Sequence, residues 1–310
     1  MKRTLIVAAI ATLSTGAALA QSSVTIYGRL NLSLERQASG GLKSSVMQNN
    51  SSRIGFKGSE DLGGGLKAGF QLEHGFNADT GTVGASFWGR QSEVNLSGGF
   101  GTLRLGNFTS EAYFATADYI SMHNHDTGTS SDALYAYIGR NTNKVAYRTP
   151  EFVKGLTVEA AVSLPEGGGR VRNYDGAVNY SSGPLHLGLG YEKAGNAKQV
   201  ALSGAYELGP IVLGGMVQRD TNAYGVGNRT NFRVSAAYMV GANEFHANVG
   251  RAGDYSGRSD SGAVQYTLAY NRNLSKRTKV YAFATKVNAE RFTGYAADFT
   301  SVAVGVRHNF

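Results

Sequence analysis

The sequence predicts an all-β fold, a 16-stranded antiparallel transmembrane β-barrel. Three observations favour it: the composition, an apolar/polar alternation of period two, and connections that are alternately short and long. The 310 residues include 42 glycines, 17 tyrosines and 14 phenylalanines but only 4 prolines. Aromatic residues favour strands and glycines supply turns, so this mixture predicts many strands joined by turns.

The first 20 residues are predicted to be a cleaved signal peptide. Lys2 and Arg3 precede an apolar run that begins at Leu5, and a small-residue cleavage site ends at Ala20. The apolar run is too short to span a bilayer as a helix. We therefore expect residues 21–310 to be exported and to form the barrel.

The first mature segment alternates with a period of two, as a strand with one apolar face does. Apolar side chains between Val24 and Leu34 fall on one face, whereas Arg29 and Asn31 fall on the other. The pattern recurs at 66–72, 178–191, 264–271 and 302–310. The parity of 211–219 and 279–286 is ambiguous in the sequence.

Sixteen such segments can be counted, about 18 residues apart (290 divided by 16). Short connections are expected at 98–101, 181–184, 207–210 and 240–243, and long ones near 37–49, 77–86, 108–141, 164–172, 220–229, 251–261 and 287–298. The connection at 194–198 is brief although it lies on the long side. Short periplasmic turns and longer extracellular loops over an even strand number are typical of the outer-membrane type.

A closed barrel of this size has room for a water-filled interior, with the apolar faces toward lipid and the polar faces toward the lumen. Tyrosines near strand ends are expected in the aromatic girdles: Tyr27, Tyr180, Tyr191, Tyr206, Tyr238 and Tyr270. Trp88 is expected to be an interface or girdle residue. The stretch "SEDLGGG" at 59–65 resembles a phosphate loop, but alternation resumes at Leu66, so it is predicted to be a hairpin turn.

Several stretches together resemble the trimeric general porins of Gram-negative bacteria, especially the β-proteobacterial branch. They include "SSVTIYGRL" near the mature start, "SRIGFKGSEDLGGGLKAGFQLE", "FGTLRLGN", and "VAVGVRHNF" at the end. The resemblance implies a homotrimer in the outer membrane, in contact with outer-membrane lipid and lipopolysaccharide. It also implies passive diffusion of ions and small hydrophilic solutes. It implies that 108–141 folds inward as a constriction loop and that Phe310 is the signal read by the barrel assembly machinery.

The chain departs from the family pattern at three places. Gly106-Asn107-Phe108 stands where the family often has Gly-Arg-Gln, and Arg104 stands where a neutral residue is common. Asn31 stands where the family frequently has aspartate. The chemistry of the relatives' constriction therefore cannot be transferred whole.

Strand parity predicts a basic wall that faces the lumen, and the long loop supplies acids that would face it. The predicted wall is Arg29, Arg53, Lys57, Lys67, Arg104 and Arg148, and the loop acids are Glu111, Asp118, Asp126 and Asp132. Cations that line a narrow pore sum to a field that favours anions, so a mild anion preference is expected. The alternative for each charge is simple solvation without a specific role.

Nothing in the sequence supports catalysis, a metal centre or a cofactor. The chain has no cysteine, and the pair His123 and His125 has no third ligand at a convincing spacing. The net charge is +8, or +6 without Lys2 and Arg3, and export argues against nucleic acid as the partner. The alternatives to a general porin are an uptake channel specific for one anionic or aromatic compound, an exported barrel with adhesive or enzymatic function, and a soluble β-sandwich.

Overall fold

The computed structural model describes residues 23–120, 133–139, 141–167, 171–290 and 298–310, so the predicted signal peptide lies outside the described residues. The strands are β1 (Ser23–Ser39), β2 (Leu42–Asn49), β3 (Arg53–Gly63), β4 (Leu66–Asn77), β5 (Thr82–Val83), β6 (Gln91–Gly98), β7 (Gly101–Asn107), β8 (Lys144–Arg148), β9 (Leu156–Ser163), β10 (Asn173–Ser182), β11 (Leu185–Ala194), β12 (Ala197–Leu208), β13 (Ile211–Thr221), β14 (Asn228–Val240), β15 (Asn243–Ala252), β16 (Ala263–Asn273), β17 (Thr278–Ala289) and β18 (Phe299–Asn309). The helical elements are α2 (Glu111–Tyr113) and η1 (Phe114–Asp118).

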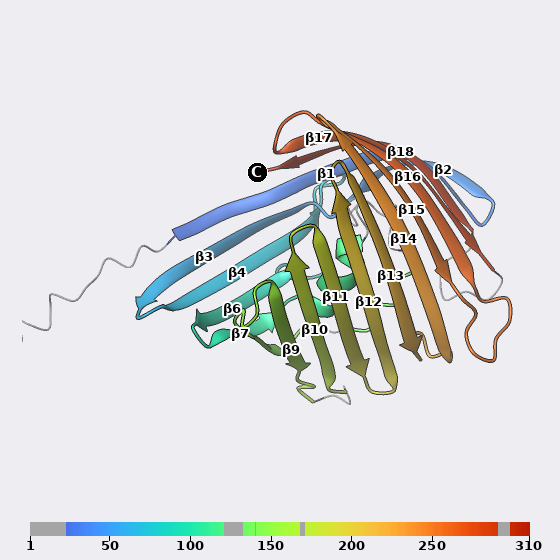
Figure 1. Cartoon of the computed structure of the whole chain (residues 1–310). Helices are drawn as coiled ribbons and strands as arrows, with labels where there is room; N and C mark the ends of the chain where they lie inside the picture. The colour runs from blue at the N-terminus through green and yellow to red at the C-terminus, as the bar shows by residue number, and fades with distance from the viewer. Residues whose placement is uncertain (1–22, 121–132, 140, 168–170, 291–297) are drawn as a thin grey trace, which may run out of the picture.

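The strands form one antiparallel sheet that closes on itself, because β1 pairs with β18 over residues 29–39 and 299–309. β2 and β3 pair with opposite halves of β1 and together make one interrupted wall strand. β5 is a two-residue annex to β4. Eighteen segments less these two give the predicted barrel of 16 strands (18 − 2). Figure 1 shows the blue β1 beside the red β18, where the ring closes.

The connections follow the predicted alternation, with one error. The short turns at 98–101, 181–184, 207–210 and 240–243 are present. The predicted long loop at 37–49 is wrong, because β1 continues to Ser39 and β2 begins at Leu42. Gly40 and Gly41 make this turn with φ of 56° and 85°, a conformation that glycine adopts without steric cost.

Two faces with opposite chemistry run along each strand. On β11, Leu187 and Leu189 are exposed on the outside, while Glu192 is buried on the inside. The structure also resolves the two ambiguous segments. On β13, Val217 points outward and Gln218 inward. On β17 the large Tyr281 and Phe283 point inward, whereas Ala282 and Ala284 point outward.

The outer face carries the predicted tyrosine girdle with one exception. Tyr180, Tyr191, Tyr206, Tyr238 and Tyr270 lie on the outward side of their strands. Tyr27 was predicted with them, and this is wrong, because its hydroxyl points into the lumen and donates to Glu73 at 3.0 Å. Trp88 packs edge-on against Phe56, whose side chain is on the outer face of β3.

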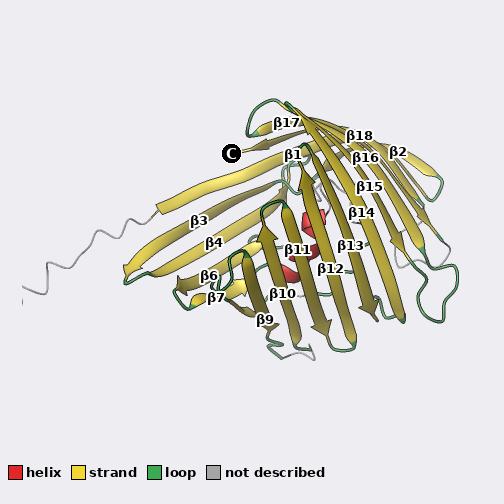
Figure 2. Cartoon of the chain, in the orientation of Figure 1, coloured by secondary structure: helices red, strands yellow, loops and turns green. Residues whose placement is uncertain are grey.

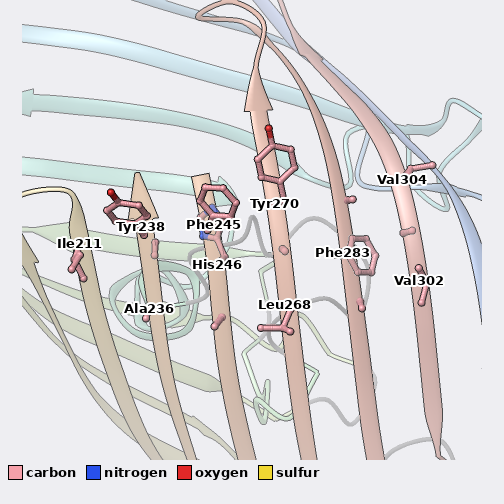
Figure 3. A pocket seen from close by; sticks show the side chains of 16 residues that line it. Ile211, Ala236, Tyr238, Phe245, His246, Leu268, Tyr270, Phe283, Val302 and Val304 are labelled. Carbon is pink, nitrogen blue, oxygen red and sulfur yellow. The ribbon is translucent and has the colours of Figure 1, made fainter. Parts of the chain in front are cut away.

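A shallow hollow of about 730 Å³ lies on the outer face over β13–β18 (Figure 3). Aromatic rings of Tyr238, Phe245 and Tyr270 form a row at its end nearest the short turns. The hollow forms there because several outward residues of these strands are alanines and valines, whose side chains are short. Within the described residues, no helix has the length and apolarity needed to cross a membrane.

Candidate functional site

The segment after β7 runs inside the ring of strands and packs on the inner wall. Figure 2 shows its helical turns in red behind β11 and β12. Within the described parts, 108–120 and 133–139, the helical turns at 111–118 contact β10, β11 and β12, and Ala115, Ala117 and Ile120 are fully buried. Within 121–132, nothing is described, so the predicted loop acids Asp126 and Asp132 and the pair His123 and His125 lie outside the described residues.

Glycines on β11 make room for this segment. A Cβ atom at Gly190 would lie 2.7 Å from the carbonyl oxygen of Ala112, and one at Gly188 would overlap the carbonyl of Ala115. Both glycines point inward, so the helical backbone rests directly on the strand. The "LGLG" alternation of 187–190 therefore encodes a docking strip.

Hydrogen bonds from wall side chains fix the segment in place. Ser203 Oγ donates to the Ala115 carbonyl at 2.9 Å, and Ser235 Oγ donates to the Ile120 carbonyl at 2.8 Å. Gln218 binds the backbone of Ala136 on both sides, accepting from its N–H at 2.8 Å and donating to its carbonyl at 2.9 Å. These bonds supply partners for backbone groups that the fold buries.

A ladder of ion pairs crosses the wall formed by β6–β9. Arg104 Nη2 lies 2.7 Å from Glu93 Oε2, and its Nη1 lies 3.2 Å from Glu159 Oε2. Arg148 Nη2 lies 2.9 Å from Glu159 Oε2 and 2.6 Å from Glu111 Oε2. Glu111 belongs to the inward segment, so the ladder joins that segment to the wall. Burial raises the pKa of the Glu111 carboxyl, and the nearby Arg148 opposes the shift.

In every pair of this region the arginine is the more exposed partner. The Arg148 side chain is 37% exposed, against 1% for Glu159 and 16% for Glu111. Arg104 is 14% exposed against 6% for Glu93. The arginine side chains of this wall are therefore in greater contact with lumen water than the carboxylates that pair with them.

Two departures from the family pattern contact each other. The Arg104 guanidinium lies 4.0 Å from the ring centre of Phe108, which is buried. Lys144 Nζ lies over the same ring at 5.3 Å and pairs with Asp175 at 2.9 Å. The ring thus supports the guanidinium by a cation–π contact and holds it against the wall.

The remaining predicted wall residues also lie on the inner face. Arg53 Nε is 3.8 Å from Glu73 Oε1, and Arg29 Nε donates to Asn309 Oδ1 at 3.2 Å. Lys57 stands over the Tyr27 ring at 5.4 Å, and Lys67 is exposed opposite Asp61 near the short turn. Of the other loop acids, Asp118 is half-buried at the end of η1.

The sequence interpretation missed the carboxylates of the wall. Glu73, Glu93 and Glu159 share the inner face with the arginines. Strand parity identifies these carboxylates too. Val94 and Leu96 fall on the outward face of β6, so Glu93 falls on the inward face. The missed acids matter because they neutralise much of the predicted basic wall.

A closed 16-strand barrel with an apolar outside and a charged, polar inside defines a β-barrel membrane channel. The family described as Gram-negative porin matches residues 5–293. The chain therefore belongs to the Gram-negative porins, which are oligomeric channels of the outer membrane for small solutes, and it is a channel protein rather than an enzyme.

The sequence similarity to known porins extends along the whole chain. Outer membrane porin protein 32 of Delftia acidovorans is 33% identical over 100% of both chains. Major outer membrane protein P.IB of Neisseria meningitidis serogroup B is 28% identical over 100% of this chain and 89% of its own. The solved anion-selective porin from Comamonas acidovorans superposes with a TM-score of 0.78 at 27% identity, covering 94% of this chain and 100% of that one.

Proposed function

We propose that this porin passes small anions in preference to cations. One observation carries the proposal: along the ladder of β6–β9, each arginine side chain is more exposed than the carboxylates with which it pairs. An ion in the pore meets the nearer charge at higher strength, because interaction energy falls with distance and is screened by water. The similar Comamonas acidovorans porin is described as anion-selective, which agrees in sign.

We further propose that 108–141 is the constriction loop and that its acids complete a transverse field. The described part of the loop brings the Glu111 carboxylate to the cationic wall, where its Oε2 lies 2.6 Å from Arg148 Nη2. The predicted basic residues Arg29, Arg53, Lys57, Lys67, Arg104 and Arg148 would then line the path of the solute. Phe310 is proposed as the assembly signal, and the chain as a homotrimer that meets lipopolysaccharide at its outer surface.

The reversal potential across a planar bilayer in a salt gradient tests the preference. We expect the sign of anion selectivity, and a cation-selective sign would refute the proposal. Conductance that rises in steps of three would support the trimer. Saturable block by one anionic or aromatic solute would instead favour the alternative of a solute-specific uptake channel.

A further inference from the structure

A polar hollow of about 450 Å³ lies on the outside of the barrel at the long-loop ends of β13, β14 and β15. It is lined by Arg219, Asn228, Thr230, Phe232, Arg251 and Ser256, among others. Asn228, Thr230 and Phe232 form the outward column of β14 between the two arginines. Its lining strand residues other than the buried, inward Arg229 point outward, and the channel function does not account for them.

Two arginines flank the hollow from neighbouring strands. Arg219 on β13 is opposite Thr230, and Arg251 on β15 is opposite Phe232, two residues further along β14. Strands β13 and β15 are two sheet spacings apart, about 10 Å, which long side chains bridge easily. Arg219 Nη1 donates to Thr230 Oγ1 at 2.8 Å, so this guanidinium already reaches over the hollow.

The position of the arginines fixes the environment that they meet. Both are exposed on the lipid-facing side, and both lie within two residues of the loop-side end of their strands. An outward arginine costs about 2–4 kcal/mol at the bilayer midplane but only about 0–1 near the interface. Directly toward the midplane, the exposed outward residues become apolar, with Val217, Phe232 and Val249. From this arrangement we infer that the arginines lie at the level of lipid head groups.

The charge around the hollow is complementary to an anion. Lys193, Lys198 and Lys286 also point outward near the loop-side ends of β11, β12 and β17. On the outward face of this loop-side half, the described residues of β11–β17 include no carboxylate. Asp254 lines the hollow, but its Oδ1 accepts hydrogen bonds from the Ser261 N–H at 2.8 Å and from Ser261 Oγ at 3.4 Å.

We propose that the hollow between Arg219 and Arg251 binds the phosphate of a phosphorylated lipid head group in the outer leaflet. Two guanidinium groups supply bidentate donors to phosphate oxygens, and Thr230 and Ser256 add hydroxyl groups at the rim. The acyl chains then run along Phe232 and its apolar neighbours. The inference rests on the proposed function in one respect, that the long loops face the outside of the cell.

The experiment compares the full chain with the double variant R219Q/R251Q, purified in detergent. Native mass spectrometry measures binding of phosphorylated lipid A, of the same lipid with its phosphates removed, and of inorganic phosphate. The matched control is R272Q, since Arg272 also points outward but lies near the short turns, bound to Asn243 at 3.0 Å. Loss of charged hydrogen bonds predicts at least about tenfold weaker binding of phosphorylated lipid A in the double variant. We expect R272Q to bind like the wild type.

Equal binding by wild type and double variant, or equal binding of the two lipids, would overturn the proposal. Dependence of inorganic phosphate binding on the two arginines, without lipid binding, would assign the hollow to free anions instead. Bilayer conductance of the same preparations reports the channel separately, so a non-conducting wild type counts against the proposed function and not against the lipid site. If the double variant fails to fold, R219Q and R251Q are measured singly, and each should weaken binding.

Discussion

The docking strip on β11 gives the sharpest test of the inward segment. In Gly188→Ala, the new methyl would lie 2.8 Å from the Ala115 carbonyl carbon and 2.7 Å from Ser203 Oγ. Ordinary contact begins near 3.4 Å, so the backbone of the segment must withdraw by at least 0.6 Å (3.4 − 2.8). Because a strand lies on one side, the movement is toward the lumen. Overpacking of this kind costs about 1–3 kcal/mol.

Single-channel conductance and thermal unfolding in detergent measure the effect. We expect a smaller conductance, since the segment moves into the path, and a lower melting temperature. The control is Gly215→Ala on the outer face of β13, where the nearest atom to the new methyl is the Arg233 carbonyl oxygen at 3.7 Å. If Gly188→Ala conducts and melts like the wild type while adopting the same fold, the segment does not rest on β11 and the constriction proposal loses its basis.

Three further predictions concern the ion-pair ladder and Phe310, the last residue, which pairs with Gly28 of β1. Arg148→Gln should shift the reversal potential toward cations more than Arg104→Gln does, because Arg148 is the more exposed, and equal shifts would contradict this reading. When the pH falls through the raised pKa of Glu111, this carboxylate is protonated and loses its negative charge, so the anion preference should increase. Because the pKa of Glu111 is higher in the folded than in the unfolded chain, the contribution of this carboxyl to the free energy of unfolding also grows as the pH falls. Reversal potentials against pH should show this dependence lost in Glu111→Gln. Deleting Phe310 removes two backbone bonds to Gly28, each of 3.0 Å and worth about 0.5–1.5 kcal/mol, so the melting temperature should fall. Phe310→Ala keeps both bonds and should lower the assembled yield in the outer membrane without that fall, if the ring is the assembly signal.

The barrel was predictable because one physical rule acts on every strand. Lipid outside and water inside impose a period of two, and this rule gave the strand number and the inward direction of Arg53, Arg104 and Arg148. It could not show that Glu159 sits between two arginines, since pairing depends on the register of β8 against β9. The prediction of a long loop at 37–49 is wrong, because this polar stretch forms the end of β1 and the strand β2 that pairs with it.

The ambiguity of 211–219 has a physical cause that locates the inward segment. Parity identifies a strand's two faces only if the inner one is wet and therefore polar. On β13 the inward Met216 is buried in a cluster with Ile120 and Tyr135 of the inward segment, so its inner face is apolar there. Gln218, two residues further along β13, is buried as well, and its side-chain amide hydrogen-bonds the backbone of Ala136 in that segment. At Met216 the inner wall is therefore dry, because the inward segment covers it. On β13, therefore, the ambiguous alternation coincides with a stretch on which the inward segment docks.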